Sequence, residues 1–339
     1  MKAKLVVVAA VFVALALAVV AGRSGSSAHA APAKTFKVGL VTDIGGIHDK
    51  GFNQLSYAGL KRAQAKLGVQ GRVLLSKSNS DYIPNLSALA RQHYDLVIAV
   101  GFLMTDAVDT VAPQFPNTKF AIIDVDQTSL KHKPKNVEGL IFREQEGGYL
   151  IGYLAGLVTK HQGGKQVVGV VGGIAIPPVN RFAAGYEAGA KAADPGVKVL
   201  VDYSQDFVAQ AKCKEKALNH IAEGSQVEFA DAGACGLGVL DAAKEKGVWA
   251  LGGDADQSYL GPEVLSSELK KVDIAVYSTI SAVVHNRFKG NGNAIFATAN
   301  GGIGIGKISS KIPRSIVTQV YAVKAKLAAG KIKNIPTTP

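Results

Sequence analysis

The chain has 339 residues, of which 47% are hydrophobic and 19% are charged, and it contains only two cysteines. This composition excludes a disordered chain, which would be poor in apolar residues, and a small disulfide-built scaffold, which would need many cysteines. The formal net charge is +12, but the basic residues are interleaved with acidic ones, so no nucleic-acid partner is expected. The length fits one large domain or two medium ones.

The N-terminus has the order of a secretory signal peptide. Lys2 and Lys4 precede an uncharged apolar run, Leu5–Ala21, and the small-residue triplet Ala28–His29–Ala30 follows. This order predicts a signal peptide over residues 1–30 with cleavage after the triplet. An uncleaved anchor is the alternative, because the apolar run is near the shortest length that spans a bilayer. In either case the body is exported, to the periplasm, the cell surface or the medium.

Strand and helix patterns alternate through the first part of the body. Strands are expected at Phe36–Thr42, Gly71–Ser76, Asp95–Val100, Lys119–Ile123 and Val137–Phe142. Helices are expected between them at Phe52–Leu67, Asn85–His93 and Thr105–Ala112. The strands are nearly continuous hydrophobic runs, which is typical of parallel strands covered by helices on both faces.

The alternation then restarts near residue 143. Helices are expected at Gln145–His161, Arg181–Ala193, Ala209–Glu223 and Leu237–Lys246, and strands at Gln166–Val171, Val197–Tyr203, Val227–Ala230 and Trp249–Leu251. The remaining elements are a helix at Asp273–Lys289, a strand at Ala294–Ala299 and a helix at Ser315–Ala329.

Two runs of βαβ units predict an α/β fold with two doubly wound parallel-sheet lobes and a ligand cleft between them. The elements left over after the second run can return and complete both lobes. We expect residues 36–142 plus about 275–310 in the N-terminal lobe, and 143–274 plus about 311–335 in the C-terminal lobe. Because no long polar linker occurs, the junction between the lobes is expected to be short and hinge-like.

Acids, glycines and aromatic residues gather where the expected strands end. Ligands of open α/β sheets bind outside the carboxyl ends of the strands, so this edge predicts a cleft between the lobes. For any single residue a loop glycine or a helix cap remains the simpler interpretation. The candidates are Asp43, Gly101–Phe102, Asp124, Asp126, Gly172–Gly173, Tyr203–Phe207, Gly233–Gly238 and Gly252–Asp254.

Five segments carry a resemblance to a known family. They are DIGGIHDKGFNQ (43–54), FREQEGGY (142–149), GACGLG (233–238), GDADQ (253–257) and SELKKVD (267–273). In order and spacing the chain resembles the basic membrane protein family, which includes purine nucleoside receptors of ABC transporters. The resemblance implies a type I periplasmic-binding fold. It also implies a non-enzymatic protein, expected to be a monomer, that delivers a purine nucleoside to a membrane permease.

The resemblance also implies roles for individual residues. Phe52 would stack on one face of the base and Phe207 on the other. Phe182 is the alternative to Phe207 for this second role. Asp43 and Asn53 would lie at the base end of the cleft. The remaining roles are hydrogen bonding of the base edge by Asp124 or Asp126, and binding of the ribose hydroxyls by Asp254 with Gly236 and Lys270.

Without the resemblance, Phe52 reads more simply as a core residue at the start of a helix. Stacking on an aromatic ring contributes about 1–3 kcal/mol per base, and a buried carboxylate discriminates against ligands that lack a donor for it.

The cysteines set this chain apart from the family pattern. Members of the family are usually lipoproteins with a cysteine at the cleavage site, and this leader contains none. A soluble exported state is therefore expected, with membrane association only through the permease or an uncleaved leader.

Cys213 and Cys235 fall in consecutive βα units, and export permits a disulfide between them. Two buried free thiols are the alternative.

Motifs that would indicate other functions are incomplete or absent. Gly301–Lys307 approaches a phosphate-binding loop, but Ile308 stands where that loop needs Ser or Thr. No nucleophile elbow and no metal-ligand spacing of histidines occurs, so no catalytic residue, cofactor or metal is expected. Two alternatives remain: a binding protein for a sugar or signalling molecule in the same fold, and a secreted nucleoside-processing α/β enzyme.

Overall fold

The computed structural model describes residues 35–339. The signal peptide predicted over residues 1–30 lies outside the described residues. Among the described residues, no helix combines the length and the apolar character needed to cross a membrane.

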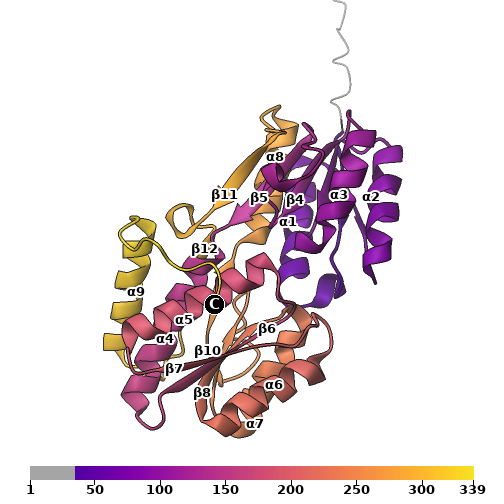
Figure 1. Ribbon diagram of the computed structural model, residues 1–339. Coiled ribbons are helices and arrows are strands. Elements are labelled where there is room, and N and C mark those ends of the chain that lie inside the picture. The colour runs from indigo at the N-terminus through magenta and orange to yellow at the C-terminus, as the bar shows by residue number, and fades with distance from the viewer. Residues whose placement is uncertain (1–34) are drawn as a thin grey trace, which may run out of the picture. The chain divides into compact units, whose positions relative to one another are not determined.

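The first lobe is built on a six-stranded sheet in which every neighbouring pair of strands is parallel. Its strands, in spatial order, are β11 (Gly292–Phe296), β5 (Val137–Phe142), β4 (Lys119–Ile123), β3 (Leu96–Ala99), β1 (Lys37–Val41) and β2 (Gln70–Leu74). The helices of this lobe are α1 (Phe52–Leu67), α2 (Tyr82–Arg91), α3 (Thr105–Val111) and α8 (Val272–Val284). Figure 1 shows α8 beside α1, although the two helices lie far apart in the sequence.

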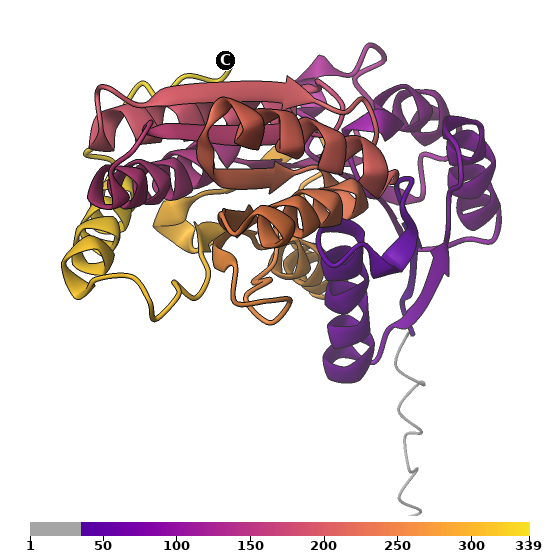
Figure 2. The ribbon, with the colours of Figure 1, turned by 90° about the horizontal axis from the view of Figure 1, so that it is seen from below.

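The second lobe has a six-stranded sheet of its own. Its strands, in spatial order, are β12 (Ile303–Ile305), β10 (Val264–Lys270), β9 (Trp249–Gly252), β8 (Ser225–Asp231), β6 (Val167–Gly172) and β7 (Lys198–Tyr203). Only the β10–β12 pair is antiparallel in this sheet. Its helices are α4 (Glu144–Gln162), α5 (Pro177–Ala193), α6 (Gln210–Glu223), α7 (Leu237–Lys246) and α9 (Arg314–Ala328). Figure 2 shows the yellow α9 beside the magenta α4.

The predicted α/β class with two parallel-sheet lobes is therefore confirmed. The sequence pattern missed β10 and β12. In β10 the residues Ser266, Ser267 and Glu268 are completely buried, so the strand does not read as a hydrophobic run. β12 is only three residues long and has a glycine in its centre. Both strands form because neighbouring strands supply the hydrogen bonds, which a local pattern cannot reveal.

The chain passes between the lobes three times. The passages lie at Arg143 between β5 and α4, at Lys271 between β10 and α8, and at residues 297–302 between β11 and β12. They are bound to one another, since Arg143 N–H donates to Phe296 O (2.8 Å) and Lys271 N–H donates to Gly302 O (2.9 Å). The last passage comes before the boundary expected near residue 310, because β12 pairs with β10 in the second sheet.

Close packing of α4 on α5 positions the start of both helices. A Cβ placed on Gly152 of α4 would lie only 2.1 Å from the carbonyl oxygen of Tyr186, and one on Gly189 of α5 only 2.0 Å from that of Tyr149. The glycines therefore allow the two helix backbones to touch. This contact brings Glu144, at the start of α4, within 2.6 Å of Arg181 in the first turns of α5.

Candidate functional site

A cavity lies between the two lobes, and its volume of about 600 Å³ includes space that is open to solvent. Most of its wall comes from residues that follow the carboxyl ends of strands, where open α/β sheets bind ligands. The first lobe contributes Asp43, Ile44, Asp49, Phe52, Asn53, Gly101, Phe102 and Asp124. The second contributes Ile176, Pro178, Val179, Phe182, Phe207, Asp231, Gly233, Ala234, Asp254 and Lys270.

Asp43 lies two residues after the end of β1 and forms hydrogen bonds with three neighbours. Its carboxylate accepts hydrogen bonds from the Tyr82 hydroxyl and from the N–H of Ile44 at 2.7 Å. The backbone N–H of Asp43 in turn donates to Oδ1 of Asn53 at 3.1 Å. Burial raises the pKa of Asp43 to about 6, although the Tyr82 hydrogen bond opposes this shift. The two side chains thus present a polar pair with fixed orientation on the first-lobe wall.

Phe52 is placed by the start of α1. The carboxylate of Asp49 accepts hydrogen bonds from the N–H groups of Gly51 (3.1 Å), Asn53 (2.8 Å) and Gln54 (3.0 Å). These donors are the N-cap residue Gly51 and two residues of the first helical turn, whose N–H groups have no partners within the helix. Asp49 therefore fixes the turn from which the partly exposed Phe52 ring faces the cavity.

The two lobes touch beside the cavity. The side-chain amide of Gln257 donates to Lys50 O at 3.2 Å, across the lobe boundary. A Cβ on Gly51 would lie 3.1 Å from Oδ2 of Asp254, so this glycine lets the first lobe approach the second. The structure is thus a closed arrangement of the lobes around the cavity.

Two aspartates of the cavity have an uncommon backbone conformation. Asp124 follows β4 with φ 70° and Asp254 follows β9 with φ 62°, both in the left-handed region that residues other than glycine seldom adopt. Such strain concentrates at functional sites. Burial raises the pKa of Asp124 to about 6 and that of Asp254 to about 7, while nearby Lys270 opposes both shifts.

Lys270 lies at the centre of a buried charge network. Its ammonium lies 2.7 Å from Oδ1 of Asp124 and 3.0 Å from Oε1 of Glu144, and Glu144 also binds Arg181. Burial disfavours the charged ammonium, but Asp124, Glu144 and Asp254 together raise its pKa. Burial likewise opposes ionisation of Glu144, and the two cations overcome it and lower its pKa. Lys270 therefore carries a fixed positive charge at the cavity wall.

The aromatic residues of the cavity differ in their exposure to solvent. Phe182 is 4% exposed and packs edge-on against Phe229, as a core residue does. Phe207 is partly exposed and lies in the loop between β7 and α6. Its ring packs on the backbone of Gly173, where a Cβ would come within 2.3 Å of the ring. Phe52 and Phe207 thus approach the cavity from opposite lobes.

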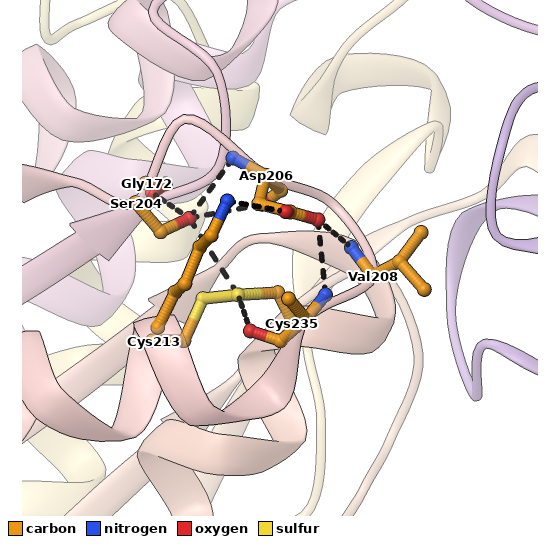
Figure 3. A network of polar contacts seen from close by, with 8 residues as sticks. Gly172, Ser204, Asp206, Val208, Cys213 and Cys235 are labelled. Atoms are coloured by element: carbon orange, nitrogen blue, oxygen red, sulfur yellow. Dashed lines mark hydrogen bonds and ion pairs between the residues drawn. A yellow bond between two sulfur atoms is a disulfide. The ribbon is translucent and has the colours of Figure 1, made fainter. Parts of the chain in front are cut away.

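The loop that carries Phe207 is tied to its neighbours, as Figure 3 shows. The carboxylate of Asp206 accepts hydrogen bonds from the N–H groups of Val208 (2.8 Å) and Ala209 (2.9 Å). A disulfide joins Cys213 in α6 to Cys235, and both cysteines are completely buried. The N–H of Cys235 donates to Phe207 O at 3.0 Å. The disulfide therefore anchors the turn at Gly233–Gly236 directly against the Phe207 loop.

Two of the predicted site residues lie away from this cavity. Asp126 is exposed, and its Oδ1 is occupied by Thr128 and by the side-chain amide of Asn293 at 2.8 Å. It caps a short turn and does not line the cavity, whereas Asp124 does. Gly236 lines a separate small cavity behind Gly233, together with Asp254 and Gln257.

The other predicted residues are brought together at the cavity wall: Asp43, Phe52, Asn53, Asp124, Phe182, Phe207, Asp254 and Lys270.

Sequence reasoning missed Asp231, Glu144 and Arg181. Asp231 is the last residue of β8, one position beyond the predicted end of that strand, and the rule that ligands bind at strand ends would have found it. Glu144 and Arg181 gave no such signal, because helix packing brings them together. Within residues 35–339, no group of three or more potential ligands is arranged to hold a metal ion.

Comparisons with known proteins agree with this geometry. Residues 36–336 match the family described as ABC transporter substrate-binding protein PnrA-like. A CD4+ T-cell-stimulating antigen of Listeria monocytogenes is 32% identical, with 96% of each chain covered. The ABC transporter nucleoside-binding protein BmpA of Lactococcus lactis is 31% identical over 94% of this chain and 96% of its own.

Solved structures support the same assignment. A solute-binding protein of an ABC transporter system from Aeropyrum pernix superposes with a TM-score of 0.80 at 28% identity, over 89% of this chain and 94% of its own. The predicted non-enzymatic class agrees with a family of binding proteins. The chain belongs to the basic membrane protein family, the PnrA-like substrate-binding proteins of ABC transporters.

Proposed function

We propose that this protein captures a purine nucleoside in the interlobe cavity and delivers it, outside the cytoplasm, to the permease of an ABC importer. The observation that carries the proposal is the pairing of two kinds of side chain in one cavity. Phe52 and Phe207 supply flat aromatic surfaces from opposite lobes, and Asp124, Asp254 and Lys270 supply charged groups between them. A nucleoside offers the complement, a planar base joined to a hydroxyl-rich sugar.

Each part of the ligand would meet a suitable partner. The base would stack between the aromatic rings, which contributes about 1–3 kcal/mol per base. The Asp43–Asn53 pair would hydrogen bond the edge of the base, because carboxylate and amide groups together offer acceptors and a donor. The ribose hydroxyls would donate to Asp124 and Asp254, in charge-assisted hydrogen bonds stronger than neutral ones.

The closed arrangement supports delivery by opening and closing. A ligand stabilises the closed state only if it contacts both lobes, and the proposed partners come from both. The hydrogen-bonded passages near Arg143, Lys271 and residues 297–302 would act as the hinge. The nucleoside-binding relative in Lactococcus lactis, at 31% identity, also favours this class of ligand.

Calorimetry with the purified protein tests the proposal. Adenosine, guanosine and inosine should bind more tightly than uridine and cytidine, and far more tightly than free ribose or the free bases. Tighter binding of free sugars than of nucleosides would overturn it and favour a sugar receptor. Chromatography of the same mixtures should show no free base after long incubation, since release of base would indicate an enzyme.

A further inference from the structure

Asp231 is a cavity residue whose carboxyl group has no hydrogen-bond or ion-pair partner within residues 35–339. It is the last residue of β8, and its carbonyl oxygen accepts a hydrogen bond from Gly173 N–H at 2.9 Å. Its side-chain atom Oδ2 is buried and finds no hydrogen-bond partner among the described residues. Buried polar groups nearly always have partners, so such an exception in a cavity points to a partner that comes from outside.

The position of Asp231 in the sheet shows which part of a ligand it would meet. β8 lies between β9, which leads into Asp254, and β6, whose following residue Gly173 supports the Phe207 ring. Asp231 therefore stands beside Asp254 and between it and the aromatic surface of Phe207. A ligand that spans from one to the other must pass Asp231.

The surroundings of Asp231 are mostly acidic. Burial, followed by the nearby carboxyl groups of Asp254, Glu268 and Glu144, raises the pKa of Asp231 well above its ordinary value, and Lys270 opposes this shift. The ammonium of Lys270 is already bound to Asp124 and Glu144. Lys270 is thus not free to pair with Asp231, and a ligand that brought a phosphate here would add further repulsion.

We propose that Asp231 is a specificity-determining residue that accepts a hydrogen bond from one hydroxyl of the sugar, so that Asp124, Asp231 and Asp254 together match the three hydroxyls of a ribonucleoside. This inference rests on the proposed function and extends it, because it adds a third sugar contact and requires a free, unphosphorylated ribose. A carboxyl group without its hydroxyl partner would remain buried and unpaired, which makes ligands lacking that hydroxyl bind weakly.

The test compares Asp231→Ala and Asp231→Asn with the wild type by calorimetry. The ligands are guanosine and its 2′-deoxy, 3′-deoxy and 5′-deoxy forms. Asp231→Ala should weaken guanosine binding about 10- to 100-fold, as expected when one partner of a buried hydrogen bond is removed. For one of the three deoxy forms, the wild type and Asp231→Ala should have nearly the same affinity. The hydroxyl missing from that form is the one that Asp231 binds. Asp231→Asn keeps an acceptor oxygen, so its affinity for guanosine should lie between those of the wild type and Asp231→Ala.

A second measurement separates recognition from a structural role. Without ligand, Asp231→Ala should melt at a higher temperature than the wild type, because it removes a buried carboxyl group without a partner. Loss of affinity together with a gain in stability is expected only of a binding residue. Asp241→Ala, an exposed aspartate of α7 in the same lobe, serves as the control and should leave guanosine affinity unchanged.

The outcomes distinguish this inference from the proposed function. If the wild type binds guanosine and Asp231→Ala weakens all four ligands by the same factor, or none of them, the role of Asp231 is overturned while the proposed function stands. If the wild type binds none of the nucleosides, both are overturned.

Discussion

The ammonium of Lys270, at the end of β10 in the second lobe, lies 2.7 Å from Oδ1 of Asp124, which follows β4 in the first lobe. Both side chains are almost completely buried at the cavity wall. One ion pair thus links the two lobes at the place where the ligand is expected to bind. Lys270 therefore contributes both to the contact between the lobes and to the charge of the site.

Replacement of Lys270 should destabilise the protein strongly. Lys270→Met leaves Asp124 and Glu144 buried without their shared cation, which we expect to lower the free energy of unfolding by about 3–5 kcal/mol. The loss should be smaller at pH 5 than at pH 8, because the uncompensated carboxylates can take up protons. Urea denaturation at both pH values measures this. Lys61→Met, at an exposed position of α1, should change stability by less than about 0.5 kcal/mol, and an equally small effect of Lys270→Met would contradict the prediction.

The ring of Phe52 should contribute equally to every purine nucleoside. Phe52→Ala should weaken adenosine, guanosine and inosine by about 1–3 kcal/mol each, because stacking does not depend on the substituents of the base. Phe52→Leu is the matched variant, since it keeps apolar volume without an aromatic face, and it should restore only part of the loss. Calorimetry measures both. A loss confined to one nucleoside would show that Phe52 reads the edge of the base instead of stacking on it.

Asp254 should make nucleoside binding depend on pH. Its pKa is raised to about 7 by burial, so the carboxyl group becomes a full hydrogen-bond acceptor only as the pH rises through this value. Nucleoside affinity should therefore increase from pH 5.5 to pH 8. Asp254→Asn should flatten that increase and reduce the preference for nucleosides over free bases. Affinity that falls with pH in the wild type would exclude this role of Asp254.

The stability of the ligand-free protein should change in the opposite direction. The folded protein holds a proton on Asp254 up to about pH 7, whereas in the unfolded chain an aspartate loses it near its ordinary pKa of 3.8. The contribution of this group to stability therefore falls as the pH rises from about 4 to about 7. Comparing the unfolding free energies of wild type and Asp254→Asn over this range isolates the contribution.

The Cys213–Cys235 disulfide should support both stability and the Phe207 loop. The cysteines are 22 residues apart in the sequence, and loop-closure entropy assigns such a bridge about 3 kcal/mol. The double variant Cys213→Ala, Cys235→Ala should lose about this free energy of unfolding. It should also bind nucleosides more weakly, because Cys235 N–H holds Phe207 O. Mass spectrometry of the wild type, unfolded in denaturant and alkylated without reduction, should find no modified cysteine, and two modified cysteines would contradict the assignment.

Much of the architecture is encoded locally and could be predicted from the sequence. Strands such as β3 and β4 are uninterrupted apolar runs, and their burial on both faces follows directly from that pattern. Asp43, Asp124 and Asp254 could be found because each follows such a strand, and parallel strands end at one edge of a sheet. The roles assigned to Phe52 and Phe207 came from the family resemblance, since an aromatic residue at the start of a helix also fits a core position.

Other features depend on partners that lie far away in the sequence. β10 buries Ser266, Ser267 and Glu268, and only pairing with β9 and β12 makes it a strand. The Lys270–Asp124 and Arg181–Glu144 ion pairs join residues whose separation in the sequence gives no hint of contact. The local sequence therefore determined the fold class and the edge at which the site lies. Only the tertiary structure decided which charged groups are paired and which polar groups, such as the Asp231 carboxyl, have no partner among the described residues, because burial and pairing arise when distant segments pack together.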